Sequence, residues 1–350
     1  MTRCDAGRLM AASAIVSAVA LWWEASCWYK RGRMISCWDF VITVRARVRM
    51  QKVIRRMLPL WVSRFDGGGA AQIKFTSSDV IVFTPPKSGT TWVTHMCHQI
   101  RTHGGALTFE DQDDVVPWID RLGTAYLRGT RFNDEPDAPH EAAPRVFKSH
   151  AEWKDRPQGT YKQVWVFRDA VDMMVSVSRF LPSLWAIERP LSEAEMCSFL
   201  LHAGDVEAAI SSLVAAWDHR HDERLLILFY EDILEDHLGT VSTLARFMDV
   251  SLTPAELKTV VEQTTQQAML NHHLAFACVK QARNAYAAEG LALDPAKLTG
   301  KVRRPTGGKP VLPEGVRAAV GRAWQHLAAQ STGCADYAGL RAAKGAWAAQ

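Results

Sequence analysis

The sequence predicts an α/β domain in three layers, in which a central parallel sheet is flanked by helices. Two observations support this fold. Four short runs are continuously apolar rather than alternating, as in strands that are buried on both faces of a sheet. Segments with apolar residues at helical spacing lie between them, and strands that alternate with helices form parallel sheets. The predicted strands are Val80–Phe83, Val146–Phe147, Val164–Phe167 and Leu225–Phe229.

Helices are predicted between and after these strands. Apolar residues recur at helical spacing from Trp92 to Ile100, directly after the first strand. The run Thr253-Pro254-Ala255-Glu256 combines a capping box with a proline in the first turn, which predicts a helix start. A further apolar stripe runs from Val316 to Leu327. Residues 102–144 and 270–312 are predicted to be long loops, and such loops often act as lids or binding loops.

Length, charge and cysteine usage limit the function classes. The 350 residues are enough for one large domain or two small ones. Residues 1–60 carry a formal charge of +8 and the remainder of the chain carries −4, so the excess of basic residues is N-terminal. A folded domain that binds nucleic acid is therefore not expected. The seven cysteines are scattered without a C-x-x-C pair. This pattern favours a reducing, cytoplasmic location over a disulfide framework or a zinc site.

Residues 1–70 are predicted to be an extension outside the folded domain, which spans residues 71–345. Leu9–Trp23 is an uncharged run of 15 residues, short of the roughly 20 that span a bilayer. The run reaches Tyr29 if Glu24 is tolerated, and basic residues follow it, which would keep the body on the cytoplasmic side. Three interpretations stay open: a membrane anchor or membrane-surface contact through residues 1–60, a targeting peptide, and a start codon placed too early.

A compact loop separates the first strand from the first helix. It reads Pro86-Lys87-Ser88-Gly89-Thr90-Thr91 and is followed by Trp92. N–H groups of a first helical turn have no intrahelical partner and the helix dipole is positive there, so this P-loop-like segment is expected to bind an anion. The loop lacks the G-x-x-x-x-G-K-[ST] pattern of nucleoside-triphosphate sites. A kinase, which would depend on a nucleoside triphosphate and Mg²⁺, is therefore disfavoured but stays an alternative.

The loop resembles the 5′-phosphosulfate-binding loop of the soluble, cytosolic-type sulfotransferases. Further blocks are similar to that family in the same order, from about residue 75 to about residue 340. They are Pro144–His150, Val164–Ser176, Leu228–Asp232 and Glu262–Thr265. The resemblance implies the donor 3′-phosphoadenosine 5′-phosphosulfate (PAPS), no metal, and a small-molecule acceptor with a hydroxyl or amine group.

The resemblance also implies roles for the residues of the loop. Lys87 would neutralise the leaving bridge oxygen and the sulfuryl oxygens. Trp92 would pack on adenine. The 5′-phosphate would be bound by Ser88, Gly89, Thr90 and Thr91.

The acceptor side is expected at the end of the second strand. His150 is the candidate general base, because a near-neutral imidazole suits the proton of an acceptor hydroxyl. Lys148 lies two residues earlier, and residues at this spacing share one face of an extended segment. Catalytic roles are therefore predicted for Lys87, Lys148 and His150. Trp118 is a candidate wall of the acceptor pocket, with an ordinary buried tryptophan as the alternative.

A second phosphate site is expected at the end of the third strand. The forked guanidinium of Arg168 suits the 3′-phosphate, with Ser176 on the next helix as a second donor. An ion pair of Arg168 with Asp169 or Asp172 is the alternative.

Tyr230 and Thr264 would contact adenine, with core packing and helix capping as the alternatives. Arg303 and Arg304 match a basic pair that closes over the 3′-phosphate, although Pro305 stands where the family has glycine, and Gln266 stands where it usually has an aromatic residue. His219 and His221 are interpreted as a solvated helix end rather than a metal site.

The predicted function is sulfuryl transfer from PAPS to a small-molecule hydroxyl or amine by in-line displacement, with His150 as the base. The alternative is a catalytically silent nucleotide-binding protein with a scaffold or membrane-associated role.

Overall fold

A computed structural model describes residues 70–124, 127–184, 192–288, 290, 292–298, 300–302, 312 and 314–348. All of them belong to the second of two structural units, residues 46–350. The predicted N-terminal extension, apart from Ala70, lies outside the described residues, as do Arg303 and Arg304. Within the described ranges, no helix has the length and apolar character needed to span a membrane.

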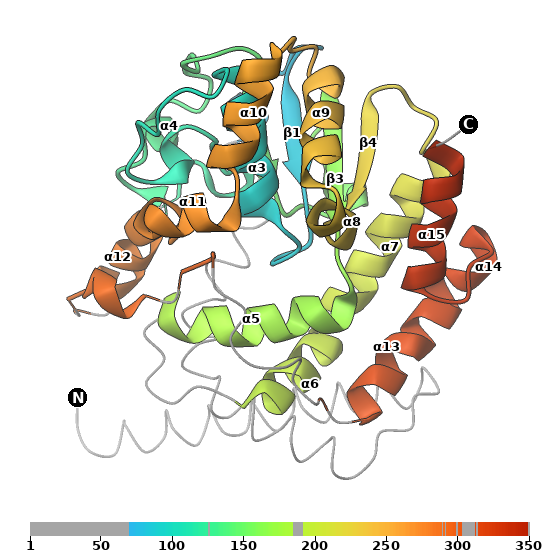
Figure 1. The fold of residues 1–350 in the computed structure, drawn as a ribbon. Helices are drawn as coiled ribbons and strands as arrows, with labels where there is room; N and C mark the ends of the chain where they lie inside the picture. The colour runs from blue at the N-terminus through green and yellow to red at the C-terminus, as the bar shows by residue number, and fades with distance from the viewer. Residues whose placement is uncertain are drawn as a thin grey trace, which may run out of the picture. The chain divides into compact units, whose positions relative to one another are not determined.

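The central sheet consists of four parallel strands in the order β2-β1-β3-β4. Figure 1 labels three of them, β1, β3 and β4. The strands are β1 (Val80–Phe83), β2 (Val146–Ser149), β3 (Lys162–Phe167) and β4 (Leu225–Phe229). All four predicted strands are confirmed, and β1 and β4 have the predicted bounds.

Helices and short helical turns connect and cover the strands (Figure 1). The α-helices are α3 (Thr90–Arg101), α4 (Arg131–Asp134), α5 (Ala170–Leu184), α6 (Glu193–Ala203), α7 (Asp205–Asp218), α8 (Tyr230–Glu235), α9 (His237–Phe247), α10 (Pro254–Gln263), α11 (Gln266–Asn271), α12 (Val279–Ala288), α13 (Glu314–Leu327), α14 (Ala329–Thr332) and α15 (Tyr337–Ala348). The 3₁₀ turns are η1 (Ala70–Gln72), η2 (Gln112–Asp114), η3 (Ile119–Arg121), η5 (Trp153–Asp155), η6 (His273–Phe276) and η7 (Pro295–Lys297).

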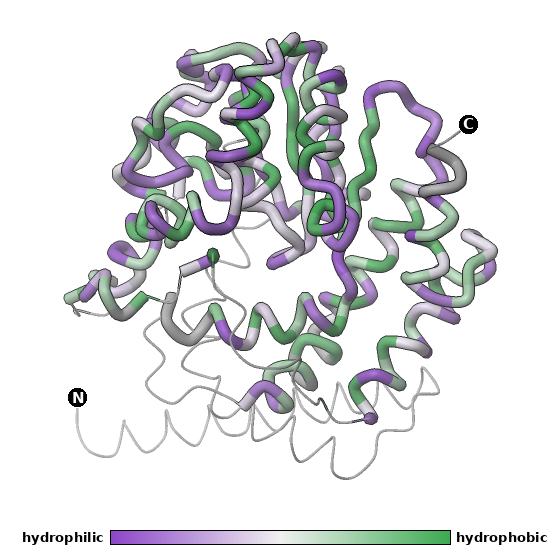
Figure 2. Tube along the Cα trace, in the orientation of Figure 1, coloured by the Kyte–Doolittle hydropathy of each residue, from purple (hydrophilic) through white to green (hydrophobic). Residues whose placement is uncertain are grey.

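The sheet divides the core into two apolar layers. Alternate residues of a strand point to opposite faces, so Val80 and Val82 pack with α3, α9 and α10, whereas Ile81 and Phe83 pack with α5, α6, α7 and α13. Figure 2 shows β1 and β4 in the green of hydrophobic residues, as expected for strands buried on both faces. The three-layer α/β fold is confirmed.

Local sequence signals explain several helix boundaries. The capping box at Thr253 is present: the Glu256 amide donates to the Thr253 hydroxyl over 3.3 Å, and the Thr253 amide donates to the Glu256 carboxylate over 2.7 Å. The prediction of a long loop over 270–312 was wrong in part, because that stretch contains α12. Its alanines at positions 282, 285, 287 and 288 favour a helix.

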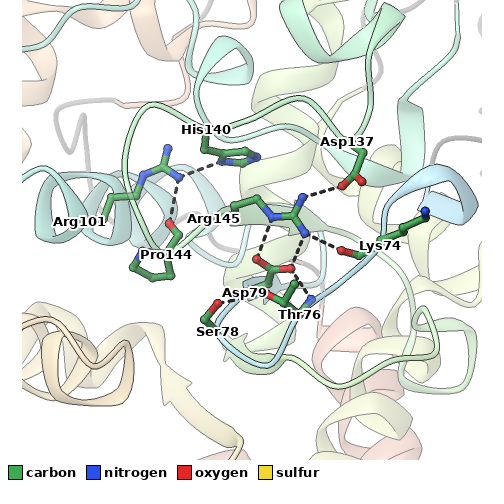
Figure 3. A network of polar contacts seen from close by, with 9 residues as sticks. All are labelled: Lys74, Thr76, Ser78, Asp79, Arg101, Asp137, His140, Pro144 and Arg145. Carbon is green, nitrogen blue, oxygen red and sulfur yellow. Dashed lines mark hydrogen bonds and ion pairs between the residues drawn. The ribbon is translucent and has the colours of Figure 1, made fainter.

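A polar network holds the amino ends of β1 and β2 (Figure 3). The Arg145 guanidinium donates to both carboxylate oxygens of Asp79, over 2.9 and 2.6 Å. The buried Arg101 at the end of α3 donates to the Pro144 carbonyl over 3.3 Å and to His140 Nδ1 over 2.9 Å. These contacts fix β2 against β1 at the edge opposite to the predicted site.

Candidate functional site

The predicted site residues gather at the carboxyl ends of the four strands. The phosphate loop follows β1, His150 follows β2, Arg168 follows β3 and Tyr230 follows β4. This is the edge at which open parallel sheets bind their ligands.

The phosphate loop has a backbone that requires glycine at one position. Lys87 and Gly89 both have positive φ, 67° and 105°. A Cβ on Gly89 would lie 2.8 Å from Cδ2 of Tyr230, too close for any side chain. Gly89 caps α3, so the amides of Thr90 and Thr91 lie in the first helical turn, where they have no intrahelical acceptor.

Ser88 and Arg168 carry polar atoms that are buried without a partner. The Ser88 side chain is fully buried, and its hydroxyl makes no hydrogen bond. The Arg168 Nε is buried and unpaired in the same way, while its Nη1 donates to the Lys87 carbonyl over 3.2 Å. Buried polar groups are rarely left unsatisfied. Ser88 lies in the phosphate loop and Arg168 contacts it through the Lys87 carbonyl, so the two unpaired donors fit a bound anion.

Lys87 and Arg168 are both positioned by aromatic rings. The Lys87 ammonium lies 3.9 Å from the ring centre of Phe180 on α5, and the Arg168 guanidinium lies 4.4 Å from the ring centre of Tyr230. Attraction to a ring face favours the charged forms of the Lys87 and Arg168 side chains but supplies no negative counter-charge. Phe180 was not predicted, because its pairing with Lys87 depends on how α5 packs. Ser176 is half-buried on the same helix.

His150 is oriented by the end of β1. Its Nδ1 donates to the Thr84 carbonyl over 2.8 Å and lies 3.2 Å from the Thr84 hydroxyl, which in turn contacts the Thr90 hydroxyl at 2.5 Å. A carbonyl only accepts, so a neutral His150 carries its proton on Nδ1 and has Nε2 as the basic nitrogen. The same contacts link the imidazole to the phosphate loop.

Asp120 joins the residues that were predicted to form the acceptor side of the site. One carboxylate oxygen accepts from the Ser149 hydroxyl over 2.7 Å, and the other accepts from the His150 amide over 2.6 Å and from Trp118 Nε1 over 2.8 Å. The rings of Trp118 and His150 consequently meet edge to face, 5.0 Å apart. Asp120 was not predicted, since its role depends on the close approach of two loops. Its spacing of two residues from Trp118 was the available signal.

Lys148 is buried beside the same tryptophan. Its ammonium lies 5.8 Å from the Trp118 ring centre and forms an ion pair with Asp113. Lys148 and His150 therefore contact the same tryptophan, as expected for residues on one face of an extended segment.

The predicted adenine residues form an aromatic group around Trp92. The Trp92 ring lies 5.8 Å from that of Tyr230 and 5.3 Å from that of His237, and Trp92 Nε1 donates to the Thr264 carbonyl over 2.8 Å. The Thr264 side chain is fully buried; its hydroxyl donates to the Val260 carbonyl over 2.7 Å and accepts from His237 Nε2 over 2.9 Å. Thr264 thus joins this group through its backbone, and its hydroxyl serves as a helix cap, the alternative role. His237 was not predicted.

Burial lowers the pKa of His237, so the neutral imidazole is favoured. Gln266 is exposed at the start of α11. The described residues contain no group of three or more His, Cys, Asp or Glu that could hold a metal ion. His219 caps the end of α7, where its Nδ1 donates to the Ala215 carbonyl over 2.8 Å, in agreement with its interpretation as a helix end.

Comparisons with known proteins identify the family of this chain. A model of the sulfotransferase domain matches residues 77–282, more than half of the chain. Sulfotransferase 1E1 of Mus musculus is 24% identical over 55% of this chain and 66% of its own length. The 3-alpha-hydroxysteroid sulfotransferase of Cavia porcellus is 26% identical over 61% of this chain and 73% of its own length.

A solved structure shares the fold. Retinol dehydratase, in complex with androsterone and the inactive cofactor PAP, superposes with a TM-score of 0.55 at 19% identity, over 73% of this chain and 81% of that one. The family match covers all four strands and the loops at their carboxyl ends that contain Lys87, His150 and Arg168. The chain belongs to the sulfotransferase domain family.

Proposed function

We propose that the protein transfers a sulfuryl group from PAPS to a hydroxyl or amine of a small molecule. The observation that carries this proposal is the pairing of an anion site with a base. The buried, unpartnered hydroxyl of Ser88 lies in the first loop, and His150, held through Nδ1 by Thr84, lies at the end of the neighbouring strand. In-line sulfuryl transfer requires the leaving phosphate, held at the anion site, and the acceptor, activated by the base, on opposite sides of the sulfur atom.

The residues around the phosphate loop would bind the donor's phosphates. The Ser88 hydroxyl, the backbone of Gly89 and the first-turn amides of Thr90 and Thr91 would hold the 5′-phosphate. Arg168 offers an unpaired buried Nε and, together with Ser176, Arg303 and Arg304, would bind the 3′-phosphate. The aromatic group of Trp92 and Tyr230 would pack against adenine.

The donor supplies an activated sulfuryl group, and three side chains would promote its transfer. His150 Nε2 would accept the proton of the acceptor as the new S–O or S–N bond forms. Lys87 and Lys148 would stabilise the charge on the leaving oxygen and the sulfuryl oxygens, since groups aimed at developing charge provide much of the rate enhancement of enzymes. In-line geometry would follow from Thr84, which links the imidazole to the phosphate loop.

The acceptor is expected to bind against Trp118. Its ring meets that of His150 edge to face, so an apolar body on Trp118 would direct its hydroxyl towards the base. The names of similar proteins refer to 3-alpha-hydroxysteroids and retinol, and one complex contains androsterone. Hydroxysteroids and other apolar alcohols are therefore the first acceptors to test, followed by phenols and amines.

We propose a cytoplasmic location. Among the described residues, Cys97, Cys197, Cys278 and Cys334 are all free thiols, which fits a reducing compartment. A membrane-surface contact of residues 1–60 is tested separately by cell fractionation of the full-length chain, where a wholly soluble protein would exclude an anchor.

The test of the function is a transfer assay with ³⁵S-labelled PAPS and full-length protein against steroid alcohols, phenols, amines and glycans. We expect label in at least one small alcohol, phenol or amine. Calorimetric donor binding without transfer to any acceptor would favour the silent nucleotide-binding alternative. Turnover that needs a nucleoside triphosphate and Mg²⁺ would favour a kinase.

A further inference from the structure

A buried ion pair lies directly behind the acceptor side of the site. The Lys148 ammonium pairs with Asp113, and the two side chains are 4% and 1% exposed. Asp113 belongs to η2, and Lys148 to β2, so the pair joins two segments that lie 35 residues apart in the sequence. An acidic residue in this position was not predicted to act on the site.

Both oxygens of the Asp113 carboxylate are held. Oδ1 accepts from Lys148, and Oδ2 accepts from Nε2 of Gln281 on α12, which is itself 1% exposed. The Asp113 amide also donates to Asp111 over 3.1 Å. The carboxylate therefore has one orientation, and Lys148 is held at a defined point next to Trp118.

The charge of Lys148 depends on this partner. A buried ammonium without a counter-charge loses its hydration without compensation and is driven towards the neutral amine. A neutral amine at this position could not stabilise the negative oxygens of a sulfuryl group. Asp113 is thus the carboxylate that pairs directly with the buried ammonium, and the neighbouring Asp111 also interacts electrostatically with Lys148.

Other titratable groups face the same cluster. Burial, followed by the charge of Asp113, raises the pKa of Asp111 to about 6. Lys301 and the thiol of Cys278 also act electrostatically on Asp111 or Asp113. At the rim, Lys280 of α12 pairs with Asp114 over 2.6 Å, and its amide donates to Asp111 over 3.3 Å.

We propose that Asp113 is a positioning residue for Lys148: it keeps the ammonium charged and directs it beside Trp118 and His150, while Gln281 fixes Asp113 from α12. The part of Lys148 in sulfuryl transfer rests on the proposed function, whereas the dependence of its charge on Asp113 does not. α12 thereby becomes part of the catalytic apparatus although none of its described side chains has been assigned to the donor or the acceptor.

The test compares Asp113→Asn with Asp114→Asn. Asparagine has the shape of aspartate, and the Gln281 amide can flip to accept from it, so the packing is retained while the charge is removed. Asp114→Asn breaks an ion pair between the same two elements, η2 and α12, only one residue away, and controls for loosening of the loop. Asp113→Glu restores the charge, and Gln281→Met releases the carboxylate without removing it.

The first readout needs neither donor nor acceptor. Lysines labelled with ¹³C at Cε are titrated by NMR, and the Lys148 signal is assigned by its loss in Lys148→Met. We expect the Lys148 signal in Asp113→Asn to reach the neutral form at a lower pH than in the wild type, because the buried ammonium has lost its paired counter-charge, and we expect no such change in Asp114→Asn. Equal titration in Asp113→Asn and the wild type would overturn the proposal. The NMR titration tests whether the charge of Lys148 depends on Asp113 even if the wild type proves to transfer no sulfuryl group.

The second readout is kinetic. Asp113→Asn should lower kcat by about 100-fold, comparable to the loss of one charge-stabilising group, while the donor Kd stays within about threefold. The loss should grow as the pH is raised, because an ammonium without its counter-charge gives up its proton more readily. Asp113→Glu should recover part of kcat, and Gln281→Met should lower kcat with Lys148 still charged. A loss in Asp114→Asn as large as in Asp113→Asn would show a merely structural role.

Discussion

The imidazole of His150 donates from Nδ1 to the backbone carbonyl of Thr84 over 2.8 Å. The carbonyl is that of the residue directly after β1, so the strand that leads into the phosphate loop also fixes the tautomer of His150, the candidate base directly after β2. Under the proposed function, this single backbone position would link donor binding to activation of the acceptor. The Thr84 hydroxyl strengthens this link through its contact with Thr90.

His150→Ala should lower kcat by about 10²- to 10⁴-fold, the usual contribution of a general base. Donor affinity should change little, because other residues are proposed to bind the phosphates. Steady-state kinetics and calorimetric titration with PAP measure the two effects. His103→Ala is the matched control, since His103 is exposed and pairs with Glu256 on α10. Near-normal turnover of His150→Ala would refute its role.

Ser88→Ala should have opposite effects with and without the donor. The free protein should be as stable as the wild type or more stable, because the hydroxyl is buried without a partner. Binding of PAP should weaken by roughly 10- to 100-fold, since hydrogen bonds to charged groups contribute about 1.5–3 kcal/mol. Thermal unfolding with and without PAP measures both. Unchanged PAP affinity would place the 5′-phosphate away from Ser88.

Gly89→Ala should lower the free energy of unfolding by more than the backbone strain of an alanine at positive φ, because the new Cβ also meets a neighbouring ring. The positive φ is strained for any L-residue, by about 1–3 kcal/mol, and the new Cβ would also meet the Tyr230 ring at 2.8 Å. Gly123→Ala is the control, because Gly123 has φ of 76° with nothing within 4 Å of an added Cβ. Urea unfolding compares the two variants. Equal losses would mean that the close approach to Tyr230 adds nothing.

Stability should fall in mild acid because of buried histidines that contact Arg101, at the edge of the sheet opposite to the candidate site. Burial lowers the pKa of His98 to about 3, and Arg101 donates to its Nδ1 over 3.1 Å, a contact that requires the neutral ring. In the unfolded chain His98 takes up a proton near its ordinary pKa of about 6.5, whereas in the folded protein it stays neutral down to about pH 3. Its contribution to the free energy of unfolding is therefore complete above about pH 6.5 and is lost as the pH falls towards 3. The loss from His98 at pH 5 is on the order of 1–2 kcal/mol.

Urea unfolding at pH 7.5 and pH 5 measures this loss, and His98→Gln isolates the contribution of His98. The acid-induced loss of stability should be smaller in His98→Gln than in the wild type. The same loss in both proteins would contradict the assignment. His140, which accepts from Arg101 in the network of Figure 3, has its pKa lowered to about 2 by burial and should act in the same direction.

Properties that depend on short stretches of chain were predictable. The strands β1 and β4, the capping box at Thr253 and the loop around Gly89 are local patterns of hydrophobicity, hydrogen bonding and backbone conformation. Residues that act through distant partners were not. Asp113, Asp120 and His237 face the site only because separate loops meet there, and no spacing in the sequence encodes those meetings.

Thr264 shows that even for a residue predicted from the sequence, the hydrogen bonds of its side chain could not be predicted. Thr264 was predicted to contact adenine, but its hydroxyl already bonds to the Val260 carbonyl and to His237. A sequence motif identifies which residue reaches a site but not which of its atoms are already bonded. Side-chain hydrogen bonds are decided by the packed neighbours, and these come from other elements.

The central claim is sulfuryl transfer without a metal. The most direct measurement is the stoichiometry of PAP formed to acceptor sulfated, with full-length protein, PAPS and a hydroxysteroid in the presence of EDTA. We predict one PAP for each sulfated acceptor and no requirement for a divalent cation or a nucleoside triphosphate. The account would be contradicted if the protein binds PAP but, with PAPS and every acceptor of the panel, forms neither PAP nor a sulfated acceptor.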